Sequence, residues 1–262
     1  MPPSNGDHER YFMQSLAKGL QVLELMASAR RPMRLTEITR ATGGNNATTT
    51  RICHTLGRLG FVRRDRQRRF HLTPKVLALG YAGVSALGWR NLAQHYMEEL
   101  WEEIKETVNL SVLDGSDILY VARINQEPFL PFDLQLGSKL PVYCTSMGKT
   151  LLAFSPPQLV EAALEGLEFS PLTHRTITDR QRFMEELSQV HEQGYAVNDE
   201  ELSVGLRSVA APVLDREGWA LAALNIAVPT KRYSRQQLEE QLAPKAMDAA
   251  RKTTQAIEAL DA

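Results

Sequence analysis

A dense group of arginines near residue 65 has the clearest chemistry in this sequence. The segment 63–69 holds five arginines and one aspartate, and like charges this close repel one another unless an anion lies beside them. Guanidinium groups bind phosphate and supply sequence-independent, salt-sensitive attraction to nucleic acid. The residues expected to lie beside the backbone or minor groove of DNA are Arg63, Arg64, Arg66, Arg68 and Arg69. The alternative is a solvated basic hairpin on an ordinary helical domain.

A helix is predicted just before this segment, and its exposed side chains could contact DNA bases. Asn46 would cap it, and Ile52, Leu56 and Leu59 would form its buried stripe. Threonine hydroxyls reach phosphates or base edges, and arginine can make a bidentate contact with guanine. The DNA-contacting residues expected on this helix and before it are Thr36, Asn46, Thr48, Thr49, Thr50, Arg51, His54 and Arg58.

Two further helices and a hairpin are needed to position these side chains. Apolar residues at helical spacing predict a helix over 15–28 whose buried face contains Leu16, Leu20, Leu23 and Met26, with Val22 beside them. A second helix, from Thr36 to the Gly43-Gly44 pair, would turn Leu35, Ile38 and Ala41 inward. Three helices followed by a basic hairpin indicate a winged helix-turn-helix domain over residues 12–73.

The rest of the chain predicts a linker helix over 74–89 and an α+β domain over 90–262. The second domain would begin with a helix and a hairpin over 107–124 that turns at 114–117. Helices are expected from Ser146, from about Pro156, before Gly194, and over 234–260. Three strand-like segments lie between 195 and 229. Strands interleaved with helices indicate a largely antiparallel sheet.

The formal net charge of −1 conceals a division of charge along the chain. Residues 1–72 hold 13 Lys and Arg against 5 Asp and Glu, whereas the remainder holds 17 against 26. A basic part joined to an acidic part indicates that only the first binds a polyanion. The two cysteines lack metal-ligand spacing. Without a long apolar run or a signal peptide, we expect a cytoplasmic protein that makes no membrane contact.

Several segments of both halves resemble the IclR family of bacterial transcriptional regulators. In the first half these are SLAKGLQVLELMA, LTEITRATG, TTTRICHTLGRLGFV and FHLTPKVLALG. In the second half they are LGSKLPVYCTSMGKTLLA, GYAVNDEELSVGLRSVAAPVLDREG and ALNIAV. YCTSMGK and DEELSVGLRSVAAPV are most similar to regulators of aromatic catabolism, the protocatechuate and β-ketoadipate group. One departure is Gly44-Asn45-Asn46, where many members have an apolar residue and proline before the recognition helix.

The resemblance implies a ligand-responsive regulator that binds a double-stranded DNA operator as a homodimer or homotetramer and needs no cofactor. Its second domain would be a GAF-like effector-binding domain. A small carboxylate, either an aromatic acid or a keto-diacid, would lie between the sheet and the helix that begins near Ser146. The implied effector-binding residues are Arg123, Tyr143, Thr145, Ser146, Met147, Gly148, Asp199, Glu200, Ser203, Arg207 and Asn225.

The residue types in this set suit such a ligand, although simpler roles are open to several of them. The helix start at 145–148 favours a carboxylate, and an arginine such as Arg123 or Arg207 could pair with it. Tyr143 could stack on a ring. Alternatively, Arg207 forms a salt bridge with Glu200 or Glu201, Asn225 holds a turn, and Arg123 pairs with Asp133.

The sequence lacks the motifs of several enzyme classes. In GKT at 148–150, the earlier glycine of a phosphate-binding loop would fall at Tyr143. His174 and His191 have no metal-ligand spacing, and SVGLRS is not a nucleophile elbow. We therefore expect no catalytic and no metal site. Two alternatives to a regulator are an enzyme with a basic N-terminal docking module and a structural DNA-binding protein whose second half only oligomerises.

Overall fold

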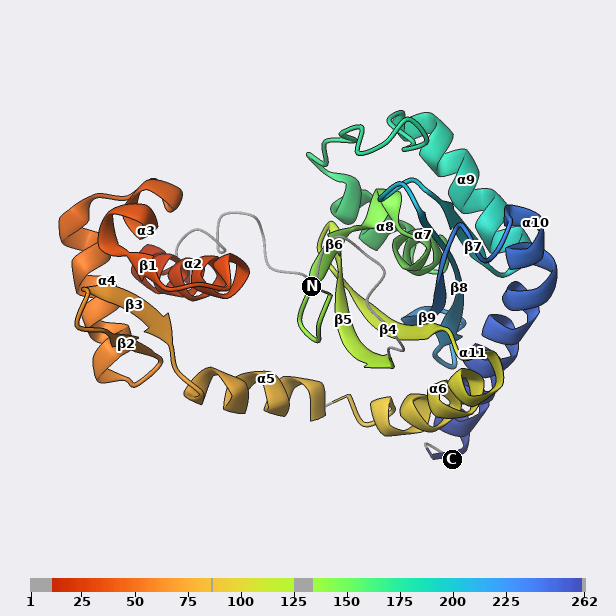
Figure 1. Ribbon diagram of the computed structural model, residues 1–262, viewed down its shortest axis with the longest axis horizontal. Helices are drawn as coiled ribbons and strands as arrows, with labels where there is room; N and C mark the ends of the chain where they lie inside the picture. The colour runs from red at the N-terminus through yellow and green to blue at the C-terminus, as the bar shows by residue number, and fades with distance from the viewer. Residues whose placement is uncertain (1–10, 86, 125–133, 261–262) are drawn as a thin grey trace. The chain divides into compact units, whose positions relative to one another are not determined.

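The computed structural model describes residues 11–85, 87–124 and 134–260. The chain divides into two compact units, residues 1–86 and 87–262, and each has its own apolar core (Figure 1). This division falls within the segment 74–89 that the sequence predicts as a linker, where α5 (Lys75–Ser85) carries the exposed side chains of Leu77 and Leu79. Within these described ranges no helix is long and apolar enough to cross a membrane.

The first unit is a winged helix-turn-helix, as the sequence predicts. Its elements are α2 (Gln14–Ala29), β1 (Met33–Arg34), α3 (Leu35–Ala41), α4 (Asn46–Arg58), β2 (Val62–Arg64) and β3 (Arg69–Leu72). β3 pairs antiparallel with both β1 and β2, and β1 is a strand that the sequence analysis did not predict. Gly43 has a φ of 62°, which allows the chain to leave α3 and turn toward α4. Val22, Ile38, Cys53 and Phe70 meet in the core.

Some of the predicted buried faces in this unit were wrong. Leu16 and Leu20 are 58% and 53% exposed because α2 faces the core with Val22 and Met26. Leu20 lies about 200° around the helix from Val22, on the opposite side. Leu59 is also exposed because α4 ends at Arg58, and Ala41, the last residue of α3, is exposed as well.

The second unit is built on a six-stranded antiparallel sheet of order β6-β5-β4-β9-β8-β7. Its strands are β4 (Thr107–Asp114), β5 (Asp117–Ile124), β6 (Lys139–Pro141), β7 (Ala196–Asp199), β8 (Leu206–Leu214) and β9 (Ala220–Pro229). Its helical elements are α6 (Arg90–Ile104), η1 (Val142–Cys144), α7 (Ser146–Ala153), α8 (Pro157–Leu164), α9 (Arg180–Gln193), α10 (Arg235–Gln237), η2 (Leu238–Leu242) and α11 (Ala243–Leu260). This confirms the predicted α+β class.

Helices cover both faces of this sheet (Figure 1). α6 and α11 pack on one face around Met97, Leu224 and Ala246. On the other face α7 packs with α8 and α9 around Leu151 and Phe183. Because side chains alternate between the faces of a strand, each strand supplies residues to both cores. Polar side chains on the face covered by α7, near the start of that helix, form the candidate site described below.

Candidate nucleic-acid interface and effector pocket

The N-terminus of α4 is capped by Asn45, not by Asn46 as the sequence predicts. Asn45 Oδ1 accepts a hydrogen bond from the Thr48 backbone N–H at 2.8 Å, which satisfies one of the amide groups left unpaired where a helix begins. Thr49 Oγ1 donates to the Asn45 carbonyl at 3.0 Å, and Thr49 is 2% exposed. This burial contradicts the predicted DNA contact by Thr49.

Most of the other predicted contacts lie on the surface of the first unit. The exposed ones are Thr36, Asn46, Thr50, Arg51, His54 and Arg58, and Thr48 is half-buried. A groove between α4 and β2 is lined on one side by Thr50 and His54 and on the other by Arg63 and Arg64. A helix face and a basic strand on opposite sides of one groove suit a DNA strand that passes between them.

Asp65 holds the turn of the β2–β3 hairpin, the wing, together. Its carboxylate accepts hydrogen bonds from the Arg69 backbone N–H at 2.8 Å and from Arg69 Nε at 3.0 Å, and it lies 2.8 Å from His71 Nε2. The hydrogen bond with His71, followed by those from Arg69, lowers the pKa of Asp65 well below its ordinary value. The acidic residue of the basic segment therefore has a structural role.

Two of the five wing arginines contact other side chains of the wing. Arg69 binds Asp65, and the Arg64 guanidinium lies over the Phe70 ring, 5.5 Å from its centroid. Arg66 and Arg68 are exposed in the turn, and their side chains make no hydrogen bond or ion pair within the described part of the chain. The two residues at the tip therefore have guanidinium groups available for phosphate.

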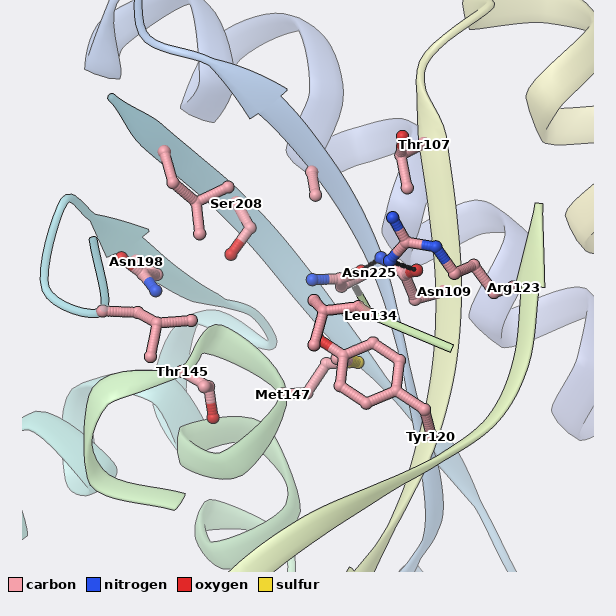
Figure 2. Close-up of a pocket in the computed structure, with 13 residues that line it drawn as sticks. Thr107, Asn109, Tyr120, Arg123, Leu134, Thr145, Met147, Asn198, Ser208 and Asn225 are labelled. Atoms are coloured by element: carbon pink, nitrogen blue, oxygen red, sulfur yellow. Dashed lines mark hydrogen bonds between the residues drawn. The ribbon is translucent and has the colours of Figure 1, made fainter. Parts of the chain in front are cut away.

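In the second unit a cavity lies between the sheet and the start of α7 (Figure 2). It is a small cavity, part of which is open to solvent. The residues that line it are Thr107, Asn109, Tyr120, Arg123, Leu134, Thr145, Met147, Asn198, Leu202, Leu206, Ser208, Asn225 and Ala227.

Strand register brings these polar side chains together from distant parts of the sequence. One row across the sheet contains Asn198, Ser208, Ala227 and Thr107, which lie opposite one another on β7, β8, β9 and β4. A neighbouring row contains Asn225, Asn109 and Arg123. The two rows are two residues apart along each shared strand, so they share one face of the sheet.

An irregularity in the β4–β5 pairing adds a ring to this face. Leu110 pairs with Ala122 and Ser111 pairs with Tyr120, so β5 has one extra residue, Val121. Such a bulge changes the face to which the following side chains point. Tyr120 and Arg123 are three residues apart, yet both line the cavity.

The cavity wall has a basic and a neutral part. Arg123 Nη1 donates to Asn109 Oδ1 at 2.9 Å, and Asn109 Nδ2 donates to Asn225 Oδ1 at 2.7 Å. On the other side, Asn198 Nδ2 donates to the Cys144 carbonyl at 2.9 Å. Burial raises the pKa of Tyr120, which keeps its hydroxyl neutral. A guanidinium, amides and an aromatic ring around one cavity suit a small carboxylic acid that carries a ring.

Some residues predicted for the pocket lie behind its wall. Arg123, Thr145, Met147 and Asn225 line the cavity, but Tyr143, Ser146 and Gly148 do not. The Tyr143 hydroxyl donates to the Ser170 carbonyl, and its ring packs against Phe169. Ser146 Oγ lies 2.8 Å from Ser208 Oγ. Gly148 is packed against the backbone of Val142.

Strand register and a turn account for the positions of four predicted effector-binding residues near the end of β7. Asp199 lies opposite Arg207 on β8, and the two form an ion pair at 2.6 Å. Arg207 therefore pairs with Asp199 and not with Glu200 or Glu201. Glu200 sits in a turn with a φ of 63°. Asp199, Glu200, Arg207 and Ser203 all lie outside the cavity lining.

The sequence left open that Asn225 holds a turn and that Arg123 pairs with Asp133. Asn225 lies in the middle of β9 and not in a turn. Asp133, the suggested partner of Arg123, lies outside the described residues.

Most of the polar cavity wall was not predicted from the sequence. The omitted polar residues are Thr107, Asn109, Tyr120, Asn198 and Ser208. One signal was available for two of them, because in TVNLS the polar residues at 107, 109 and 111 alternate with Val108 and Leu110. This pattern indicates a strand with one polar and one apolar face inside the protein.

A buried lysine fixes the segment after β7 to α7. Lys149 is 1% exposed, and its Nζ lies 2.6 Å from Glu201 Oε1 and 2.9 Å from Glu186 Oε1. Burial raises the pKa of Glu201, and the nearby Lys149 opposes this rise. Leu202, next in the chain, lines the cavity, so the ion pair supports the cavity wall. Among the described residues, no group of three or more His, Cys, Asp or Glu side chains could hold a metal ion.

Comparison with protein families identifies both units. The IclR helix-turn-helix domain matches residues 15–66, and the C-terminal domain of the bacterial transcriptional regulator IclR matches residues 82–255. The chain belongs to the IclR family. Members of this family are transcriptional regulators, so the chain is a DNA-binding regulator with an effector-binding domain and not an enzyme with a docking module.

Relatives within the IclR family include regulators of aromatic metabolism. The Pca regulon regulatory protein of Pseudomonas putida is 37% identical over 92% of this chain and 82% of its own length. The p-hydroxybenzoate hydroxylase transcriptional activator of Acinetobacter baylyi is 32% identical over 89% of this chain and 88% of its own. A crystal structure of a double mutant of the PobR inducer-binding domain from Acinetobacter, in complex with 3-hydroxybenzoic acid, is 32% identical over 63% of this chain and 96% of that chain, with a TM-score of 0.58.

Proposed function

We propose that this IclR-family regulator controls genes of aromatic-acid catabolism and that its effector is a small carboxylate bound in the cavity of the second unit. The observation that carries the proposal is the cavity wall itself, where the Arg123 guanidinium and the Asn225 amide line the same cavity as the buried Tyr120 ring. The names of the two relatives and the bound 3-hydroxybenzoic acid in the PobR domain support an aromatic acid over an aliphatic one.

The proposed effector contacts partly match those expected from the sequence, because Arg123, Thr145 and Met147 are kept and Tyr120, Asn198 and Ser208 are added. A carboxylate would pair with Arg123, and a ring would lie against Tyr120 and Met147. Hydroxyl groups would bind the neutral side chains at the other part of the wall, Thr145, Asn198 and Ser208. Keto-diacids are the alternative effector class, and they belong in the same test.

Thermal unfolding with a panel of ligands tests this assignment. The panel is protocatechuate, 3- and 4-hydroxybenzoate, β-ketoadipate and several aliphatic acids. A ligand present at 100 times its Kd stabilises the native state by about 2.7 kcal/mol, which is easily measured as a shift in Tm. Arg123→Met should abolish the shift, and Arg182→Met, at an exposed position on α9, should keep it. If no acid shifts the wild-type Tm, the assignment to aromatic acids fails.

For DNA, we propose that α4 enters the major groove of an operator and that the wing contacts the flanking backbone or minor groove, in a homodimer or homotetramer. The proposed base contacts come from the exposed residues of α4, of which Arg51 is the best suited to guanine. Selection from a library of random duplexes would yield the operator. Arg51→Ala should then weaken binding to it by about 1–3 kcal/mol and leave binding to unrelated DNA nearly unchanged. Equal losses on both would exclude a base contact by Arg51.

A further inference from the structure

Three polar side chains lie directly opposite one another on adjacent strands at the cavity. Asn109 on β4 is paired with Asn225 on β9 and with Arg123 on β5. Asn109 is 1% exposed and Asn225 is 4% exposed, so both side chains are largely shielded from bulk solvent. The observed bonds run from Arg123 Nη1 to Asn109 Oδ1, and from Asn109 Nδ2 to Asn225 Oδ1.

The chemistry of arginine determines the direction of this chain of bonds. A guanidinium only donates hydrogen bonds, whereas an asparagine amide has an accepting end and a donating end. Arg123 therefore requires Asn109 to present its oxygen, and the NH₂ group of Asn109 must then face Asn225. Asn225 accepts that bond with its oxygen, which leaves its own NH₂ group on the side away from Asn109. Figure 2 shows this nitrogen turned into the cavity, toward β7 and β8.

Asn198 and Ser208, across the cavity, do not set this orientation, because their hydrogen bonds run to groups other than Asn225. Asn198 donates to the Cys144 carbonyl and accepts from the Glu201 backbone N–H. The hydroxyl of Ser208 is bonded to that of Ser146. The orientation of Asn225 is thus controlled through Asn109 by a cation two strands away.

We propose that Asn109 is a positioning residue that holds Asn225 with its NH₂ group toward the effector, so that Arg123 and Asn225 together offer the effector only hydrogen-bond donors. Such a wall selects a carboxylate, which only accepts, over a carboxamide of the same shape, whose NH₂ group would meet another donor. The inference rests on the proposed carboxylate effector and adds the residues that select a carboxylate over a carboxamide.

Ligand preference in a double-mutant cycle tests the role of Asn109. The Kd values of 4-hydroxybenzoate and 4-hydroxybenzamide are measured for the wild type, Asn109→Leu, Asn225→Leu and the double variant. Leucine has nearly the same shape and no charge, so the charge around the ligand does not change. Asn109→Leu should reduce the preference for the carboxylate about tenfold, the effect of one unsatisfied buried group. It should cause no further loss when Asn225 is already leucine, because it acts through Asn225.

Asn91→Leu, on the exposed surface of α6, is the matched control and should keep the full preference. If Asn109→Leu also keeps the full preference for 4-hydroxybenzoate over 4-hydroxybenzamide, the positioning role of Asn109 is refuted. Binding of 4-hydroxybenzoate to the wild type would still support the proposed carboxylate effector.

A measurement without ligand tests the orientation independently. In full-length protein labelled with ¹⁵N-asparagine, the Asn225 side-chain NH₂ should exchange with water faster than that of Asn109, which is bonded within the protein. Slow exchange at Asn225 would overturn the inference even if neither compound binds. If neither compound binds and Asn225 exchanges fast, the proposed effector class fails while the orientation itself is supported.

Discussion

Replacing Gly148 with alanine should displace the start of α7 and destabilise the second unit. A Cβ atom at this position would lie 2.2 Å from the Val142 carbonyl oxygen and 2.4 Å from the Val142 Cα. Both are backbone atoms, so no change of rotamer relieves the overlap. Either α7 or η1 must move, and Thr145, which joins them, lines the cavity together with Met147.

The expected magnitude is the difference between two opposing effects. Overpacking costs about 1–3 kcal/mol, and a clash with rigid backbone belongs at or above the top of that range. Alanine in place of glycine within a helix returns about 1 kcal/mol. We therefore expect a net loss of about 2 kcal/mol in the free energy of unfolding of the second unit, with weaker effector binding.

Tryptophan fluorescence during urea unfolding is a suitable assay because Trp89, Trp101 and Trp219 are the only tryptophans and all belong to the second unit. The matched control is Gly88→Ala, where a Cβ would have no heavy atom within 4 Å. The control should stay within about 0.5 kcal/mol of the wild type. Equal stability of the Gly148 and Gly88 variants would refute the close packing of α7 on η1.

Three further predictions concern other parts of the chain. Asn45→Ala should lower the free energy of unfolding of the first unit by about 1 kcal/mol and Asn46→Ala by much less, because only Asn45 caps α4. The measurement is unfolding followed by circular dichroism, which detects the helices of the first unit although that unit has no tryptophan. Equal losses in the two variants would contradict the cap. Arg66→Ala and Arg68→Ala should each lower the slope of log K against log salt for DNA by about 0.9 per DNA-bound protomer in anisotropy titrations. An unchanged slope would mean that the wing tip does not reach a phosphate. Glu201→Gln should remove the part of the pH dependence of the unfolding free energy that comes from titration of Glu201. Because burial raises the pKa of Glu201 above its ordinary 4.5, the folded state retains a proton that the unfolded state releases. The wild type should then lose stability relative to the variant as pH rises from about 4.5 through the raised pKa, and parallel curves of unfolding free energy against pH would contradict this.

Local features of the sequence predicted most helices and strands of the fold, although not β1. The winged helix-turn-helix follows from apolar spacing, from the stop at Gly43 and from the hairpin around the arginines. In the second unit, the 107–124 hairpin and the helix that ends at Gly194 occur as predicted. These features depend on residues within a few positions of one another, and their geometry requires no knowledge of distant segments.

The candidate pocket was only partly predictable because it depends on strand register. The resemblance to IclR regulators led to Thr145 and Met147 at the start of α7. It could not separate Asn198, which faces the cavity, from its neighbour Asp199, which faces Arg207. A shift of one residue in pairing reverses the face to which a side chain points, and pairing is decided across the sheet.

The sequence by itself determined the class of protein, the two-domain order and the concentration of positive charge in the wing, because these depend on composition, periodicity and motif order. Only the tertiary structure decided which polar groups meet at the cavity. Asn109, Arg123 and Asn225 are separated by up to 116 positions in the chain, yet they form one line of hydrogen bonds. Strand order, register and one bulge create that line, and each of them results from the packing of the whole second unit.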